Sequence, residues 1–480
     1  MHIILYVADA LRADHLNCYG YHRQLSPNID TIAKEGVIFE RCFTSSTWTR
    51  PVAASLLTGL YPGVHQTQTR SDKFLSISLR LPHLLNSMGF RTAAFSTMGN
   101  VSTDVGFEPG FDEFSNLFRD PEIISKRRRL DAVEEGLISD SVQKIALPWA
   151  EDINPFLFRW LECNRLNSTF SFVWSIETHV PYVAPPHFRR FSRVNAKSNA
   201  GEREDIQTAR ESDRQRIIDL YDDEIFYNDH CIGEIVDYLK SIHIYEDTLL
   251  VLVGDHGDSF YEHGVYTHGH MPYEELIHVP MIIKLPNSQY VGKRIDALVE
   301  LIDIFPTILN AAGISPDMKE NIIVQGVNLL PLIQDDVRKV KEYVFSDTQM
   351  VRVHNRYLSI RGDRWKYIQV NRPERSGRNL KETIHYVLER RLIVNMLRSP
   401  RHFIRNYFNR SNEFLFDLEN DPQEQFNLAG DRTDVARELK DILWNWQLNN
   451  QSLASKYSFS PGTLEESDLL RNHLEELGYL

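Results

Sequence analysis

The chain has 480 residues, 42% hydrophobic and 25% charged, which is enough to bury a sizeable core and unlike the composition of a disordered protein. Its 53 Lys and Arg against 66 Asp and Glu give a net charge of −13, which argues against a nucleic-acid binder because such proteins carry a basic footprint. The four cysteines are widely spaced without a CxxC pair, which favours reduced thiols over a disulfide scaffold or a zinc ribbon.

The first residues read directly into a strand, without the basic region and long apolar region of an export signal. No apolar run reaches the roughly 18–20 residues that a membrane span needs. We therefore expect a cytoplasmic protein.

Short apolar runs rich in β-branched and aromatic residues recur along the chain and predict buried strands. The predicted strands are 3–7, 92–95, 170–176, 248–253 and 280–283. Helical patterns at 79–88 and 213–239 lie between them. This alternation predicts an α/β fold with a large, mainly parallel sheet flanked by helices on both faces. We assign it to residues 1–337, with polar inserts at about 120–165 and 185–215.

The pattern changes after residue 337, where 346–369 and 414–418 predict a smaller C-terminal α/β subdomain within 338–480. Its segment 372–410 contains ten Lys and Arg against three Glu, interleaved with apolar residues. Such a basic amphipathic helix can contact a membrane surface or an acidic glycan. The alternative, which we favour, is a solvated helix face packed on the main domain.

Polar side chains follow two of the predicted strands. Asp9 comes after the first strand, and Asp255 and His256 come after 248–253. In open α/β sheets ligands bind beyond the carboxyl ends of the strands, and carboxylates with an imidazole suit a divalent metal. Nearby His263, His268 and His270 could equally be polar surface, but Asp9 favours a metal site.

Residues 46–59 are rich in hydroxyl groups, and Thr49 stands near the start of a predicted helix. Such hydroxyls commonly cap helices, while a helix N-terminus also favours an anion beside it. Capping and catalysis are therefore both open for Thr49.

Motifs in a fixed order along most of the chain resemble the sulfatase family of the alkaline phosphatase superfamily. They are Asp9-Ala-Leu-Arg-Ala-Asp14, Ser26-Pro-Asn-Ile-Asp30 with Glu35-Gly-Val-Ile-Phe39, Ser55-Leu-Leu-Thr-Gly59, Gly106-Phe107 with Gly110-Phe-Asp112, Thr178-His179-Val-Pro181, Asp255-His256-Gly257 with Glu262-His263-Gly264, Asp303-Ile-Phe-Pro306-Thr307 and 416–428. The resemblance implies the fold of that superfamily and a metal-dependent hydrolase or transferase acting on an anionic ester.

The nucleophile motif departs from the family. Sulfatases carry Cys or Ser in C/S-x-P-x-R and oxidise it to formylglycine, whereas the spacing to Gly59 places Thr49 there and Ala53 at the arginine position. Threonine cannot become the aldehyde, so an ester on Thr49 must be resolved by water or an acceptor alcohol attacking the bound group. This departure favours a phosphoester or phosphodiester over a sulfate ester.

The metal motif departs as well. The family usually has two adjacent aspartates and an Asp-Asn pair, where this chain has Ala10 and Asp255-His256. Because a carboxylate is lost and an imidazole gained, one Mn²⁺ or Zn²⁺ ion is favoured over Ca²⁺.

The resemblance also implies the roles of the site residues. Asp9, Thr49, Asp255 and His256 would hold the metal, with Thr49 as nucleophile, although Ser45, Ser46 and Thr47 are competing hydroxyls. His179 and His268 would bind the anion or protonate the leaving group, and His263 and His270 would support them. Arg12 and Arg50 are candidate anion contacts for which helix packing or a surface position is at least as good an explanation.

Two other functions stay open. One is a sulfuric ester hydrolase acting on a glycan or aryl sulfate, and the other is a sulfatase-like protein that binds an anion without turnover. Turnover of any phosphate or sulfate ester would exclude the second.

Overall fold

The computed structural model describes residues 1–74, 80–126, 147–193, 201, 205–206, 209–314, 323–349, 355–372, 411–456, 462–464, 467–477 and 479. The basic segment 372–410 lies, apart from Arg372, outside the described residues, and so does part of each predicted insert. Among the described residues, no helix combines the length and the apolar character needed to cross a membrane.

A large sheet forms the centre of the molecule, with the strand order β11-β2-β10-β7-β1-β6-β4-β5. Its pairings are parallel except for the two made by β10, which runs antiparallel to β2 and β7. The predicted α/β fold with a mainly parallel sheet is thus confirmed. The strands are β1 His2–Ala8, β2 Val37–Phe43, β4 Arg91–Ser96, β5 Glu113–Asn116, β6 Thr169–Ser175, β7 Thr248–Gly254, β10 His278–Lys284 and β11 Lys293–Glu300.

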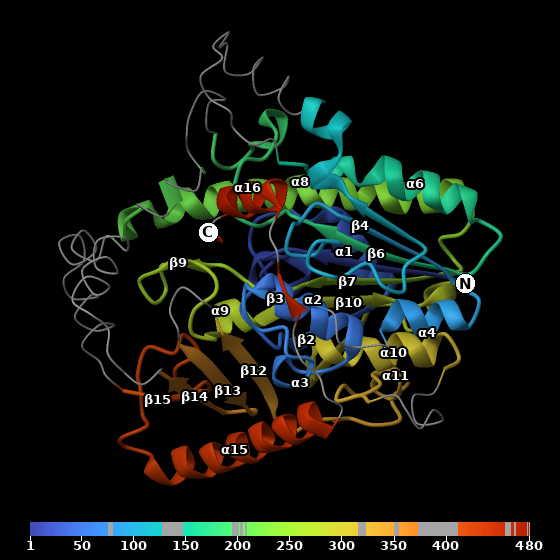
Figure 1. The fold of residues 1–480 in the computed structure, drawn as a ribbon. Coiled ribbons are helices and arrows are strands. Elements are labelled where there is room, and N and C mark those ends of the chain that lie inside the picture. Colours follow the sequence, from blue (N-terminus) through green and yellow to red (C-terminus); the bar gives the residue numbers. More distant parts are fainter. Residues whose placement is uncertain are drawn as a thin grey trace.

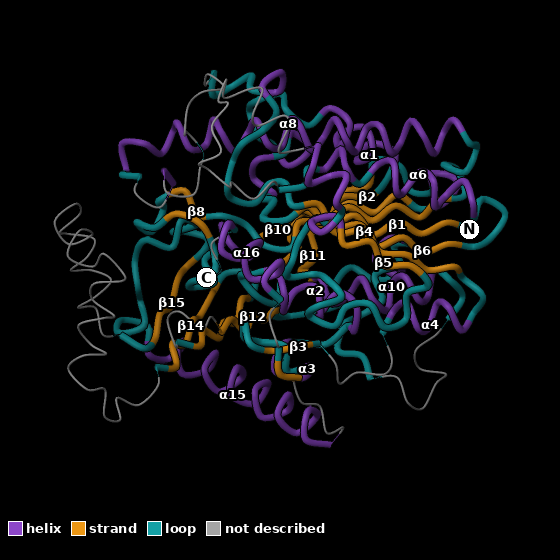
Figure 2. Tube along the Cα trace, turned by 45° about the horizontal axis from the view of Figure 1, so that its top comes forward, coloured by secondary structure: helices purple, strands orange, loops and turns teal. Residues whose placement is uncertain are grey.

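Helices cover both faces of this sheet (Figures 1 and 2). The central strand β1 is buried throughout, because Ile3, Leu5 and Val7 face one layer of helices while Ile4 and Tyr6 face the other. One layer consists of α1 Pro27–Glu35, α6 Asn154–Cys163 and α8 Arg214–Ser241. The other layer includes α2 Thr49–Thr58, α4 Leu81–Ser87, α10 Ile304–Ala311 and α16 Asp468–Glu476.

A second, smaller sheet is antiparallel and lies beside the large one (Figure 1). It consists of β12 Val344–Gln349, β13 Arg356–Arg361, β14 Trp365–Asn371 and β15 Glu413–Asp417. The long helix α15 (Thr433–Lys456) covers one of its faces, where Leu439 and Leu443 pack on Leu358 and Leu415. The remaining short elements are α3 Pro62–His65, β3 Asp72–Lys73, β8 Ser259–Phe260, β9 Tyr266–Thr267, α9 Glu274–Ile277, α11 Leu330–Ile333 and β16 Gly462–Thr463.

The end of the chain does not stay with the small sheet. Strand β16 pairs with β3, and Leu470, Leu474 and Tyr479 belong to the core that includes α2. The domain boundary at 337/338 stays a prediction, but the last described residues contact the larger unit. Figures 1 and 2 place the C-terminal end on the side of the sheet away from the N-terminus.

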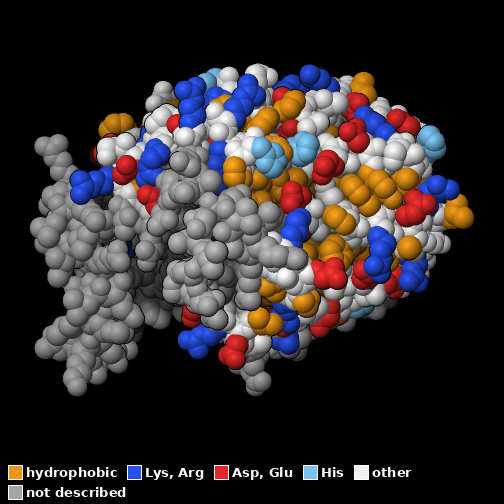
Figure 3. Space-filling model, turned by 90° about the horizontal axis from the view of Figure 1, so that it is seen from above, with side chains coloured by type: hydrophobic (Ala, Val, Ile, Leu, Met, Phe, Trp, Pro, Cys, Tyr) orange, Lys and Arg blue, Asp and Glu red, His pale blue; other side chains and the backbone are white. Residues whose placement is uncertain are grey.

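The face of the molecule in Figure 3 carries Lys and Arg close to Asp and Glu. No continuous basic area covers the described part of this face. The charges that matter for the chemistry are instead buried at one edge of the large sheet.

Candidate active site

Two carboxylates meet at the carboxyl edge of the large sheet. Strands β1 and β7 are parallel neighbours, with Ala8 opposite Gly254, so that Asp9 and Asp255 leave the sheet side by side. The two loops touch closely, because a Cβ atom on Gly254 would lie 2.3 Å from the backbone oxygen of Leu11. The backbone N–H of Ala10 donates to Asp255 Oδ1 over 2.9 Å and fixes that carboxylate.

Thr49 joins this pair from the start of α2. Residue Trp48 is the N-cap, and the Thr49 side chain makes no capping bond, so its hydroxyl is free to point at the carboxylates. Thr49 Oγ1 lies 3.4 Å from Asp9 Oδ2 and 3.5 Å from His256 Nε2. The structure therefore does not support the capping alternative for Thr49.

The other hydroxyls of this segment bond elsewhere. Ser45 donates to Ser55, Ser46 lies beside Thr348 Oγ1, and Thr47 donates to the backbone oxygen of His270. Of the four candidate hydroxyls, Thr49 is the one whose contacts in the described structure reach Asp9 and His256.

The cluster of Asp9, Asp255 and His256 fits a cation. One ligand atom from each of these three residues lies within 4.8 Å of the other two, and all three side chains are fully buried. Among the described residues, Asp9 Oδ1 and Asp255 Oδ2 have no hydrogen-bond partner, and His256 Nε2 lies 3.6 and 3.3 Å from them. Buried carboxylate oxygens without partners are costly unless a cation neutralises them.

The electrostatics of the cluster agree with this fit. Burial, followed by the negative charge of Asp255, raises the pKa of Asp9 well above its usual value. Burial raises the pKa of Asp255 to about 8, and burial together with the charge of His268 lowers the pKa of His256 to about 3. The protein thus holds acceptor atoms in a place that disfavours their charge, which a bound cation would reverse.

Two further histidines face the same space. His268 Nδ1 lies 2.7 Å from Asp258 Oδ1, which leaves Nε2 directed at the site, and His179 Nδ1 lies 2.5 Å from the oxygen of Val180. The rings of His179 and His268 are 4.7 Å apart, centroid to centroid. The rings of His256 and His268 are 4.4 Å apart, so the structure brings these histidines together with the Asp9, Asp255 and Thr49 cluster.

Sequence reasoning missed two residues here. Asp258 directly follows the Asp255-His256-Gly257 motif, and a carboxylate at that position is a signal that could have pointed to its contact with His268. Tyr479 carries no such signal. Its hydroxyl lies 2.8 Å from Thr49 Oγ1, 3.1 Å from His179 Nε2 and 3.3 Å from His268 Nε2.

The two candidate arginines are used for packing. Arg12 pairs with Asp14 and Glu262, and Arg50 donates to Asn100 Oδ1 and to the backbone oxygen of Asp72. These contacts favour the structural explanation for both residues.

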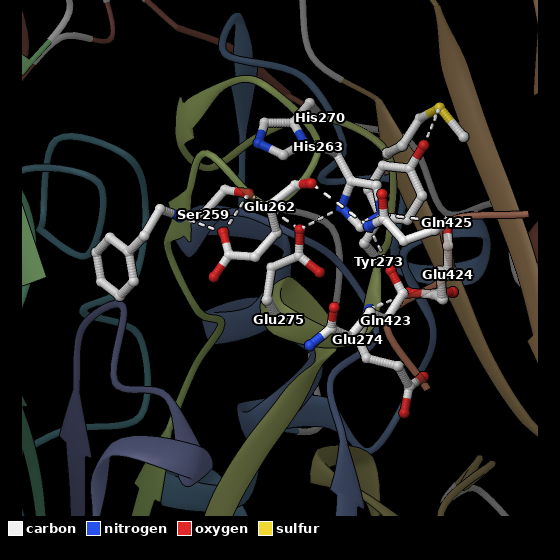
Figure 4. Close-up of polar contacts among 12 residues, drawn as sticks. Ser259, Glu262, His263, His270, Tyr273, Glu274, Glu275, Gln423, Glu424 and Gln425 are labelled. Carbon is white, nitrogen blue, oxygen red and sulfur yellow. Dashed lines mark hydrogen bonds and ion pairs between the residues drawn. The ribbon is translucent and has the colours of Figure 1, made fainter. Parts of the chain in front are cut away.

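His263 lies beside Glu424 and Gln425, and His270 lies nearby (Figure 4). His263 Nδ1 lies 2.8 Å from Glu275 Oε1, and its ring stacks on Tyr273 at 3.5 Å. His270 Nε2 lies 3.0 Å from the oxygen of Thr267. Both histidines help to line a cavity of about 220 Å³ whose other walls include Tyr357, Phe414 and Gln425.

The geometry is that of a metal-dependent hydrolase of anionic esters, with a hydroxyl beside a buried Asp/Asp/His set and histidines opposite. The family model described as Sulfatase matches residues 1–314, and one described as N-sulphoglucosamine sulphohydrolase, C-terminal, matches residues 261–377. The chain belongs to the sulfatase family, and it is a hydrolase acting on ester bonds.

Similar curated proteins span most of the chain. A Δ4,5-hexuronate-2-O-sulfatase of Bacteroides thetaiotaomicron is 24% identical over 451 residues, covering 88% of this chain and 84% of that protein. An arylsulfatase of Clostridium perfringens is 23% identical over 504 residues, covering 91% and 93%.

Similar solved structures support the fold. One is a protein in complex with its substrate D-glucosamine-2-N,6-O-disulfate, with a TM-score of 0.67, 19% identity and coverage of 95% of this chain and 98% of the other. Another is the phosphonate monoester hydrolase of Agrobacterium radiobacter, with a TM-score of 0.67, 18% identity and coverage of 97% and 100%.

Proposed function

We propose that this protein hydrolyses or transfers phosphate esters, phosphomonoesters or phosphodiesters, with Thr49 as the nucleophile and one Mn²⁺ or Zn²⁺ ion as cofactor. The observation that carries the proposal is the position of the Thr49 hydroxyl, 3.4 Å from Asp9 and 3.5 Å from His256 in the buried Asp/Asp/His cluster. Asp9, Thr49, Asp255 and His256 would hold the ion.

A threonine favours phosphoryl chemistry over the family's sulfate chemistry. It cannot be oxidised to the formylglycine that releases sulfate by collapsing to an aldehyde. An ester on Thr49 must be broken at the bound group itself. A bound divalent ion supplies a lowered pKa for the attacking hydroxyl and neutralises charge on the nonbridging oxygens.

The histidines would give a proton to the leaving group and take one from the second nucleophile. Burial lowers the pKa of His268 to about 3 and that of His179 well below its usual value, so the negative charge of the bound ester would have to raise these values before either ring donates. Thr49 would lose its hydroxyl proton to solvent as Oγ attacks phosphorus, and the bond from phosphorus to the leaving oxygen would break while a protonated His268 or His179 gives that oxygen a proton from Nε2. The neutral ring would then take a proton from the water or acceptor alcohol that attacks phosphorus in the phosphoryl-Thr49 ester. The bond from phosphorus to Thr49 Oγ would break, and that oxygen would regain a proton from solvent. Asp258 accepts from His268 Nδ1–H and keeps Nε2 turned to the site.

A second candidate is sulfate ester hydrolysis on a glycan or aryl sulfate. Relatives such as the Δ4,5-hexuronate-2-O-sulfatase favour it, because their names state sulfatase activity. The similarity to these relatives covers most of this chain. The two candidates differ in the atom attacked and in the fate of the ester on Thr49.

Turnover of generic aryl phosphate, phosphodiester and sulfate substrates with Mn²⁺ or Zn²⁺ tests the proposal. We expect phosphoester turnover, and we expect Thr49→Ala to lower kcat/KM at least about 10³-fold without loss of fold. Peptide mass spectrometry after a brief substrate pulse should find the adduct on Thr49.

Ser46→Ala is the matched control, because its hydroxyl lies in the same segment but bonds to Thr348. It should retain turnover within a few-fold. Undiminished activity in Thr49→Ala would overturn the nucleophile assignment. A sulfate-only activity would replace the first candidate by the second, and binding without turnover of any ester would indicate an anion-binding protein.

A further inference from the structure

Tyr479 lies within the candidate active site. Tyr479 is 3% exposed, and its hydroxyl is within hydrogen-bond distance of Thr49 and of both site histidines, at 2.8, 3.1 and 3.3 Å. The tyrosine ring stacks on His179 with 5.5 Å between centroids and lies 6.2 Å from the ring of Trp48. A residue far from the motifs in sequence thus meets the groups that the chemistry needs.

Helix α16 holds this tyrosine in place through one face. Leu470 and Leu474 are fully buried in the core that includes α2. The backbone N–H of Tyr479 donates to Leu474 over 2.8 Å, and Arg70 Nη1 donates to the backbone oxygen of Tyr479 over 3.1 Å. The docked position is therefore specified by several contacts and does not depend on one side chain.

The tyrosine oxygen stands where the reacting group of a substrate must stand. In-line attack needs the reacting atom about 3–3.5 Å from the nucleophile, and the phenol oxygen lies within that distance of Thr49 Oγ1. His179 and His268, which we propose to bind the anion, direct Nε2 to this same oxygen. Tyr479 and a substrate anion exclude each other.

Docking of the helix also carries a cost. His473 is buried against Phe118 and the backbone at Gly99, and its Nε2 has no hydrogen-bond partner within the part of the chain that the structure describes. The outer face of α16 is solvent-exposed, with Leu469 at 56% exposure. A short helix attached by one face can open locally while the large sheet stays folded.

We propose that the C-terminal segment, α16 with Tyr479, is an internal inhibitor that competes with the substrate's anionic group for the space beside Thr49. Substrate binds when the segment leaves. This regulation rests on the proposed function, because it assumes that the anion binds where Thr49, His179 and His268 converge.

Binding of inorganic phosphate to the full chain with Mn²⁺, measured by calorimetry, tests the competition. We expect Tyr479→Ala to bind phosphate at least 10-fold more tightly than the unaltered protein. Tyr479→Phe, which keeps the ring and loses the hydrogen bonds, should bind phosphate with an affinity between those of the unaltered protein and Tyr479→Ala. Leu469→Ala, on the exposed face of the same helix, should bind as the unaltered protein does. Equal or weaker phosphate binding by Tyr479→Ala would overturn the proposal.

Hydrogen exchange reports on the segment without any turnover. Saturating phosphate should speed amide exchange in 468–477 of the unaltered protein, because the bound anion displaces the tyrosine. Unchanged exchange at saturation would show that phosphate binds with the segment still docked, which also overturns the proposal.

The two proposals fail in different ways. Tighter phosphate binding by Tyr479→Ala without turnover of any ester would sustain the inhibitory segment and remove the catalytic proposal. Turnover by the unaltered protein, with KM and phosphate affinity unaffected by Tyr479→Ala, would sustain the catalytic proposal and remove the inhibitory segment.

Discussion

This protein buries charged groups in two regions, and the regions differ in whether the buried charges are paired. At the carboxyl edge of the large sheet, Asp9 and Asp255 keep one oxygen each without a partner. At the junction with the small sheet, Lys341 lies 2.5 Å from Glu300 and 2.7 Å from Asp303. The first region has buried charge prepared for a ligand, and the second has buried charge already neutralised by the fold.

The difference predicts how each region responds to substitution. A buried ion pair that loses one partner leaves an uncompensated charge and destabilises the protein. When a cluster of like charges loses one member, the repulsion within the cluster falls, but the cluster no longer binds its cation. Stability should therefore fall at the junction and rise at the carboxyl edge.

The largest effect on stability is expected for Lys341→Met. The buried carboxylates of Glu300 and Asp303 would lose their shared cation, which should lower the free energy of unfolding by about 3–5 kcal/mol. Urea unfolding measures the loss. Lys339→Met is the control, because Lys339 pairs with Glu342 at the surface and should cost less than about 1 kcal/mol. Equal losses in the two variants would contradict the contrast between buried and exposed pairs.

An intermediate effect that depends on pH is expected at the buried pair of His263 and Glu275. Burial alone would raise the pKa of Glu275, but the hydrogen bond and charge of His263 lower it to about 2. For His263, burial acts to lower the pKa, but the hydrogen bond to Glu275 raises it overall. The carboxylate's contribution is present above its unfolded pKa of about 4.5 and is lost as pH falls toward 2. The imidazole's contribution is present below about 6.5 and is lost as pH rises through the raised value.

Glu275→Gln should therefore destabilise the protein most between about pH 4.5 and 6.5, by on the order of 3 kcal/mol. The difference in the free energy of unfolding between Glu275→Gln and the unaltered protein should be smaller at pH 3 and also at alkaline pH. Unfolding curves across pH measure it, and Glu419→Gln, at an exposed pair with Arg364, is the control. A difference that does not vary with pH would contradict the ion-pair explanation.

The sequence predicted the central strands because they are continuously apolar. The runs at 3–7 and 248–253 are β1 and β7, which are buried on both faces. Strand β2 escaped prediction because Glu40 and Arg41 interrupt its apolar pattern, and β11 escaped because it is an edge strand with charged residues. An apolar sequence pattern therefore predicts the strands that are buried on both faces, because their residues are apolar throughout.

The residues of the candidate site also differ in whether a local sequence pattern predicts them. Asp9, Asp255 and His256 were predictable because Asp9 and Asp255 directly follow neighbouring parallel strands and His256 is the next residue after Asp255. Tyr479 was not predictable, because its contact with Thr49 joins residues 430 positions apart and depends on how α16 packs. No local pattern encodes such a contact.

The smallest expected effect on stability tests the comparison most directly. Replacing Asp by Asn should raise the free energy of unfolding at the carboxyl edge of the large sheet and lower it at the junction with the small sheet. In Asp9→Asn the amide oxygen can keep the bond from Trp174 Nε1, and the amide nitrogen replaces the oxygen that has no partner. Removal of a carboxylate that burial and the charge of Asp255 both disfavour should stabilise the metal-free protein by about 1–2 kcal/mol. Asp347→Asn, which breaks the pair with Arg356 at the junction, should destabilise it.

Added Mn²⁺ separates the causes further. It should raise the Tm of the unaltered protein, since a ligand that binds only the folded state stabilises it, and should not raise that of Asp9→Asn. If Asp9→Asn were destabilised without metal, the carboxylates would be supporting the fold in the way the junction does. If Mn²⁺ stabilised both proteins equally, Asp9 would not be a ligand, and the unpartnered oxygens at the sheet edge would need another explanation.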